Sequence, residues 1–201
     1  GTVSRFGLAD MAMSFEQIGP ITKDVSGSAL LLSIIAGEDY RDATTFGSER
    51  RDFIKELEKK EARKLRIGVP KEFFEGCDSQ VEKIVRKKIE ELSEFYEVKE
   101  ISLPIARYAI PVYYLNVYAE FSSAMQKYDG IKYGFPYREG RDLIEAVSEA
   151  RSASLGREVK RRILLGTYIT MQEFRDAWYT KTLKARSLMK REFEQAFRQV
   201  D

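Results

Sequence analysis

The chain has 201 residues, a length that fits one domain or a large part of one. Hydrophobic residues make up 43% and charged residues 33%, which is the composition of a folded protein and not of a disordered one. The charges of the 34 basic and 32 acidic residues nearly cancel, so the chain lacks the strong positive charge that favours binding to nucleic acid. No apolar run approaches the roughly 18 residues of a membrane span and no signal peptide opens the chain, so we expect a cytoplasmic protein without membrane contact.

The residue types that are missing exclude several kinds of site. There is no histidine, which rules out a Ser-His-Asp triad, a Cys-His pair and any histidine-based metal site within this chain. The single cysteine, Cys77, cannot form an internal disulfide or a cysteine-rich zinc site. We therefore predict no metal site here.

The first sixty residues favour helices separated by a polar turn. Apolar residues over 24–36, followed by Gly37, predict a short and mostly buried helix that the glycine ends. The segment 38–50 is polar and typical of a turn. Residues 52–63 place apolar side chains on one side and charges on the other, which predicts an amphipathic helix.

The next forty residues have the pattern of a βαβ unit. Short apolar runs over 65–70 and 98–103 predict two strands. Between them, Asp78 precedes a helical repeat of apolar residues, and Ser79 to Glu82 has the spacing of a capping box. Strand, helix and strand in this order predict a parallel pair with a crossover.

The second half of the chain is mostly helical. The segment 110–125 is an aromatic-rich helix, followed by a glycine-containing loop over 128–137 and shorter helices over 143–150 and 157–165, the last ended by Gly166. A capping-box spacing over 170–173 then predicts a helix from Met171 to about Gln199, on the order of 40 Å long at about 1.5 Å per residue.

No set of residues forms a complete active site by spacing alone. The serines are scattered, and Ser26 and Ser28 stand at a helix start, where capping is the ordinary role. The basic run over 157–162 has two interpretations: cations near a helix C-terminus, or an arginine that binds a carboxylate or phosphate. Tyr113 and Tyr114 are likewise either core residues or polar groups of a ligand pocket.

Several segments resemble the amidase signature family. They include Val3-Ser4-Arg5-Phe6-Gly7-Leu8, the segment 14–22 with Gln17-Ile18-Gly19-Pro20, and above all the block 158–168, Glu-Val-Lys-Arg-Arg-Ile-Leu-Leu-Gly-Thr-Tyr. The block is most similar to the glutaminase subunits of tRNA-dependent amidotransferases within this family. The resemblance implies an α/β protein of the amidase-signature α/β/α fold with a mixed central sheet, helix-rich in the second half. It also implies that residues 1–201 are an internal part of a single amidase domain, truncated at both ends.

The resemblance also implies which residues act and which are missing. The family uses a Ser-Ser-Lys set located upstream of the segments matched here, so no catalytic residue is assigned to this chain. The family arginine that binds the α-carboxylate of glutamine corresponds to Arg162, with Arg161 as the second choice. A tyrosine of the same pocket corresponds to Tyr113, with Tyr114 as the second choice. The bidentate geometry of a guanidinium explains why lysine would be a poor substitute.

The implied reaction is hydrolysis of glutamine to supply ammonia for converting Glu-tRNA(Gln) to Gln-tRNA(Gln). Its implied partners are subunits B and C of the amidotransferase, glutamine, and Glu-tRNA(Gln) through the complex. No cofactor is expected in this chain, since ATP and Mg²⁺ are used by a partner subunit. Two alternatives stay open: a segment of another amidase-signature hydrolase, and a non-catalytic interaction module.

Overall fold

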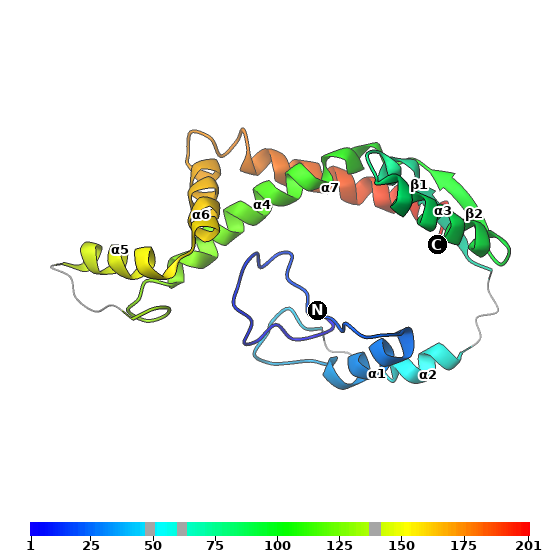
Figure 1. The fold of residues 1–201 in the computed structure, drawn as a ribbon, viewed down its shortest axis with the longest axis horizontal. Helices are drawn as coiled ribbons and strands as arrows, with labels where there is room; N and C mark the ends of the chain where they lie inside the picture. Colours follow the sequence, from blue (N-terminus) through cyan, green and yellow to red (C-terminus); the bar gives the residue numbers. More distant parts are fainter. Residues whose placement is uncertain (47–50, 60–63, 137–141) are drawn as a thin grey trace. The chain divides into compact units, whose positions relative to one another are not determined.

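The computed structural model describes residues 1–46, 51–59, 64–136 and 142–201. These residues form two compact units, Gly1–Ala62 and Arg63–Asp201 (Figure 1). Each unit has its own helices and its own internal contacts, and the residues discussed below as a candidate site all belong to the second unit.

The first unit contains helices α1 (Val25–Ile35) and α2 (Phe53–Glu58). Both begin after an aspartate whose carboxylate accepts a backbone N–H, as N-caps do. The helix over 24–36 is thus confirmed, but the prediction that it is mostly buried is wrong. Among its residues only Ala29 is buried, because the six-residue α2 is too short to cover the apolar sides of α1. Residues 47–50 and 60–63 of the predicted turn and helix lie outside the described residues.

Asp42 fixes the N-terminal segment of this unit. Its carboxylate accepts hydrogen bonds from the backbone N–H of Arg5 at 2.8 Å, from the Arg5 guanidinium at 3.3 Å, and from the backbone N–H and hydroxyl of Thr44. These bonds, with the Arg5 backbone N–H the largest cause, hold the pKa of Asp42 well below its usual range. The carboxylate therefore stays ionised and bound at neutral pH.

The predicted βαβ unit is confirmed. Strand β1 (Arg66–Pro70) pairs in parallel with β2 (Glu97–Ile101), with Arg66 opposite Glu97, and helix α3 (Ser79–Ser93) connects them. The capping box starting at Ser79 is wrong by one residue. Asp78 is the N-cap, since its Oδ1 accepts from the backbone N–H of Gln80 and Val81 at 2.9 and 3.2 Å. A carboxylate accepts these bonds more strongly than a hydroxyl, so Ser79 becomes the first helical residue.

The remaining chain is helical, as expected. Its longer helices are α4 (Ala109–Ala124), α5 (Leu143–Ser154), α6 (Arg157–Thr170) and α7 (Tyr179–Ala196), and its short 3₁₀ helices are η1 (Lys71–Phe74), η2 (Pro104–Tyr108) and η3 (Met125–Lys127). Helix α4 packs most extensively on α6, which crosses it, and also on α7, which lies beside it and reaches the strands (Figure 1). The loop predicted over 128–137 is non-helical over its described residues, and Tyr137 lies outside them.

Two predicted boundaries in this part are wrong. Gly166 does not end a helix, because α6 continues to Thr170. The next helix starts at Tyr179 and not at Met171, so its 18 residues span about 27 Å. The Thr170 hydroxyl donates to the Gly166 carbonyl at 2.8 Å, and it therefore bonds back into α6 instead of capping a new helix.

Gly166 lies where α4 and α6 approach most closely. A Cβ built on Gly166 would stand 1.9 Å from the carbonyl oxygen of Tyr118 and 2.6 Å from the side chain of Ser122. Both Gly166 and Ser122 are buried. The glycine is needed for the helix crossing, which explains its place inside a helix despite its poor helix propensity.

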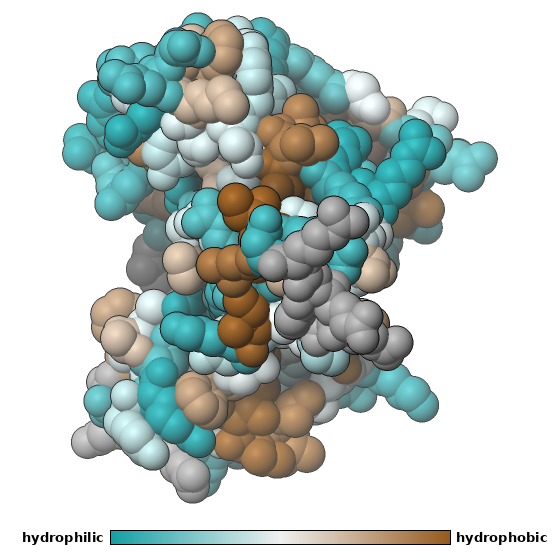
Figure 2. All heavy atoms as spheres, turned by 90° about the vertical axis from the view of Figure 1, so that its left-hand side faces the viewer, coloured by the Kyte–Doolittle hydropathy of each residue, from teal (hydrophilic) through white to brown (hydrophobic). Residues whose placement is uncertain are grey.

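Many large apolar side chains are exposed in the described residues. The strongest cases around α5 are Ile144, at 79% exposed, Leu143 and Tyr133. Figure 2 looks at the end of the molecule that carries α5 and shows brown apolar surface interrupted by teal polar residues. No helix in the described residues is both long enough and apolar enough to span a bilayer.

Replacing Gly166 by alanine should destabilise the second unit. An exposed helix interior favours alanine over glycine by about 1 kcal/mol, but overpacking against a backbone oxygen costs about 1–3 kcal/mol or more. We expect a net loss of about 1–2 kcal/mol in the free energy of unfolding, measured by urea denaturation. Gly156→Ala is the control, because nothing lies within 4 Å of a Cβ there. An unchanged or raised midpoint for Gly166→Ala would contradict the close crossing.

Candidate substrate-binding site

Arg161 and Arg162 stand in the second turn of α6, and one carboxylate holds both. Arg161 donates from Nε and Nη2 to the two oxygens of Glu158, each at 2.7 Å. Arg162 donates from Nε to Oε1 of Glu158 at 2.8 Å. This geometry follows from the helix, since residues three and four apart lie on one side of it. The side chain of Arg162 is 29% exposed and that of Arg161 is 52% exposed.

Three tyrosines of α4 form a row of ring contacts that ends at Arg161. Tyr113 meets Tyr114 edge to face at 5.5 Å between centroids, and Tyr114 meets Tyr118 at 5.7 Å. The Tyr118 hydroxyl accepts from Nη2 of Arg161 at 3.3 Å, and the guanidinium lies 5.6 Å from the centre of the Tyr118 ring. A cation at this distance from an aromatic face is attracted to it. The contact joins α6 to α4 across 43 residues of sequence.

The residues predicted from the sequence therefore lie on the two helices that pack most extensively. Arg162 is on α6 and Tyr113 on α4, and the contact that links the helices at this point is made by their neighbours Arg161 and Tyr118. Glu158 and Tyr118 were not singled out as site residues from the sequence. The signal for Glu158 was its spacing of three and four residues from the arginines, and for Tyr118 its position four residues after Tyr114.

The electrostatics of the cluster favour full ionisation. Hydrogen bonds from Arg161 first, and then from Arg162, lower the pKa of Glu158 from 4.5 to about 2. The same bonds raise the pKa of Arg161 above its ordinary value. At neutral pH the cluster thus holds two guanidinium cations and one carboxylate. Its net charge of one positive unit suits a ligand that carries a single carboxylate.

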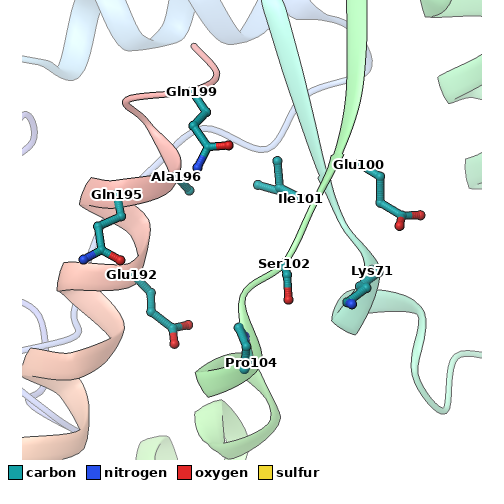
Figure 3. Close-up of a pocket in the computed structure, with 9 residues that line it drawn as sticks. All are labelled: Lys71, Glu100, Ile101, Ser102, Pro104, Glu192, Gln195, Ala196 and Gln199. Carbon is teal, nitrogen blue, oxygen red and sulfur yellow. The ribbon is translucent and has the colours of Figure 1, made fainter.

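A second feature is a pocket of about 510 Å³ between the end of β2 and α7 (Figure 3). Glu192 and Gln195 project from α7, and Gln199 lies just after its end, while Ser102 follows β2 and Lys71 follows β1. Ser102 is the one hydroxyl among the labelled residues, and it donates to Oε1 of Glu72 at 2.5 Å.

Glu72 is a poor base for activating Ser102. Burial alone would raise the pKa of this carboxyl, but the backbone N–H of Leu103 and the Ser102 hydroxyl donate to it and leave its pKa lowered. A base that removes a serine proton needs a pKa nearer to neutral. The hydrogen bonds of Glu72 therefore fix the segment that follows β2, and they do not activate Ser102 as a nucleophile. Among the described residues, no group of three or more Asp, Glu or Cys side chains is placed to hold a metal ion.

Comparison with known proteins defines the class to which this fold belongs. The family model described as Amidase matches residues 1–201, so the chain belongs to the amidase family. The chain is 44% identical to the A subunit of glutamyl-tRNA(Gln) amidotransferase from Carboxydothermus hydrogenoformans, and 47% identical to the same subunit from Moorella thermoacetica. Both matches cover all of this chain, which spans 42% and 41% of the length of those proteins.

Solved structures agree with this assignment. The crystal structure of the A subunit of glutamyl-tRNA(Gln) amidotransferase from Thermotoga maritima matches all of the chain with a TM-score of 0.67 and 29% identity, over 39% of its own length. A bacterial aryl acylamidase of the amidase signature family, at 19% identity and a TM-score of 0.62, shares the fold over 91% of the chain. The predicted family and the α/β fold class are confirmed.

The low pKa of Glu158 can be measured directly. We expect the side-chain carboxyl carbon of Glu158 to titrate near pH 2 by NMR, well below the ordinary value of 4.5. Because the folded pKa is lowered, the paired state is complete above about pH 4.5 and is lost as the pH falls towards 2. Arg161→Gln should raise the midpoint more than Arg162→Gln, since Arg161 donates twice. A midpoint near 4.5 in the unaltered protein would show that the pairs do not persist in solution.

Proposed function

We propose that this chain is the central segment of the glutaminase subunit of a tRNA-dependent amidotransferase. The parent protein hydrolyses glutamine to glutamate and ammonia, and the ammonia converts Glu-tRNA(Gln) to Gln-tRNA(Gln). The observation that carries the proposal is the match of the whole chain to amidotransferase A subunits at 44–47% identity. The arginine cluster of α6 supplies a chemical reason, since glutamine carries one α-carboxylate that must be bound.

Arg162 is the residue we assign to that carboxylate, with Tyr113 as a pocket residue. Arg161 donates to Glu158 from both Nε and Nη2. Arg162 donates from Nε alone in its hydrogen bonds to described residues. The two terminal nitrogens of Arg162 can therefore take a carboxylate as a bidentate pair. Arg162 is also the less exposed of the two, which strengthens a charge pair.

The remaining parts of the reaction belong to other segments and subunits. We assign the Ser-Ser-Lys set of the family to a part of the parent protein outside residues 1–201. Subunits B and C complete the complex, which binds Glu-tRNA(Gln), and a partner subunit uses ATP and Mg²⁺ to activate the glutamate. The complex works in the cytoplasm, where aminoacyl-tRNA is used for protein synthesis.

A simple amide hydrolase is the second candidate. Its support is structural, since an amidase at 25% identity and a TM-score of 0.67 matches the whole chain. Such an enzyme has no need to bind an α-carboxylate. Substrate preference between glutamine and an amide without a carboxylate therefore separates the two functions.

The isolated 201-residue chain should have no glutaminase activity. The reason is that we assign the nucleophile to a segment outside it, and the chain has no histidine to activate one of its own serines. Ammonia release from glutamine by the pure chain should equal the blank. Steady turnover that is lost on mutating a serine within residues 1–201 would contradict this prediction.

Arg162→Ala in the complete enzyme should impair the use of glutamine and spare the use of ammonia. A charge-assisted pair contributes about 1.5–3 kcal/mol, so we expect kcat/KM for glutamine to fall about 10- to 150-fold. Amidation of Glu-tRNA(Gln) with free ammonia should persist, because ammonia does not need the carboxylate site.

Arg86→Ala is the matched control for this variant. Arg86 is also an exposed helical arginine that pairs with a glutamate four residues earlier, at 2.7 Å, but it lies on α3. It should leave both activities unchanged. Unaltered glutamine kinetics in Arg162→Ala would refute the assignment, and an equal fall of both activities would indicate a role in stability alone.

A further inference from the structure

Arg161 and Arg162 donate to Glu158 from different sets of nitrogen atoms. Glu158 accepts two bonds from Arg161 and one from Nε of Arg162. Nη2 of Arg161, which donates to Glu158, also donates to the hydroxyl of Tyr118 on α4. Among the described residues, no hydrogen bond is made by the terminal Nη atoms of Arg162.

We infer that Glu158 is a positioning residue for the substrate carboxylate, and this inference rests on the proposed function. Glu158 holds Arg162 by Nε and leaves Nη1 and Nη2 for the α-carboxylate of an amino-acid amide. Arg161 and Tyr118 in turn hold Glu158 in place. The order of contacts is Tyr118, Arg161, Glu158 and Arg162, and it runs from α4 to the nitrogens that bind substrate.

The geometry favours positioning over competition with the substrate. A carboxylate can bind a guanidinium along the edge formed by Nε and Nη or at the end formed by the two Nη atoms. Glu158 takes the Nε side of Arg162, so the end remains available. Without Glu158, the neighbouring guanidinium groups would repel each other and Arg162 would lose the bond that limits its rotamers.

Glu158 can be altered without disturbing the helix packing. Its side chain is 54% exposed, and the crossing of α4 and α6 depends on Gly166 at another turn of α6. The hydrogen bonds that lower its pKa to about 2 keep it ionised at neutral pH, so glutamine in its place removes a real charge.

The test uses the complete enzyme with its partner subunits and the variant Glu158→Gln. We expect KM for glutamine to rise about 5- to 10-fold while kcat stays within about twofold, because the loss is in orienting the bound carboxylate. Tyr118→Phe, which removes one hydroxyl farther along the row of contacts, should raise KM about 2- to 3-fold. Ammonia-dependent amidation should be unchanged in both variants.

A substrate without the α-carboxylate supplies the decisive comparison. With 4-aminobutanamide, kcat/KM should be the same for the unaltered enzyme and for Glu158→Gln. Glu82→Gln is the matched control, since Glu82 pairs with Arg86 on α3 in the same spacing, and it should leave all kinetics unchanged.

Each other result overturns the inference in a recognisable way. A KM for glutamine that falls in Glu158→Gln would show that Glu158 competes with the substrate, and an unchanged KM would show that it does nothing. Equal losses with glutamine, ammonia and 4-aminobutanamide would show a structural role. If Arg162→Ala itself leaves glutamine kinetics intact, the proposed function fails. If Arg162→Ala impairs glutamine use and Glu158→Gln does not, the positioning role alone fails.

Discussion

The contact between Gly166 and the backbone of Tyr118 is the constraint on which the candidate site depends. With no Cβ on residue 166, helix α6 approaches α4 until the Tyr118 carbonyl occupies the space that a side chain would take. Arg162 precedes Gly166 by four residues and so lies on the same side of α6. The close crossing thus brings the arginine-bearing turn of α6 beside the tyrosines of α4, and the hydrogen bond from Arg161 to Tyr118 is its result.

The charges at this crossing explain why two arginines stand together. A single guanidinium on a rotatable side chain loses conformational entropy when it binds a carboxylate. A neighbouring carboxylate shared by two guanidinium groups fixes one of them in advance, and the second arginine balances the negative charge that this carboxylate adds. Lysine could not replace Arg162, because it lacks the planar set of donors that permits Nε to be held while the two Nη atoms remain available.

Sequence patterns predict the helices and strands correctly where the local signals agree with the packing. They predict wrong boundaries where packing between helices overrides those signals. The βαβ unit was predicted because apolar runs, a helical repeat and a cap all indicated the same structure. Gly166 was interpreted as a helix end because glycine commonly ends helices, and its use for a close crossing depends on α4, some forty residues earlier. The capping box predicted to start at Thr170 does not form, because the Thr170 hydroxyl donates to a carbonyl of α6. Capping-box spacing shows that a capping hydrogen bond is possible. Whether it forms depends on the other acceptors within reach of the hydroxyl.

The same distinction applies to the site. Family resemblance predicts Arg162 and Tyr113 as pocket residues, and the helical spacing of Glu158 to both arginines is visible in the sequence. The hydrogen bond from Arg161 to Tyr118 is not visible in the sequence, because it joins residues 43 positions apart and depends on the crossing angle.

The exposure of this cluster weakens its attraction for a carboxylate. With Arg161 and Glu158 more than half exposed, water screens their charges, and a screened pair binds a carboxylate weakly. Tight binding of a carboxylate at this cluster would therefore require further protein surface over it, because excluding water lowers the local dielectric and strengthens the charge pair.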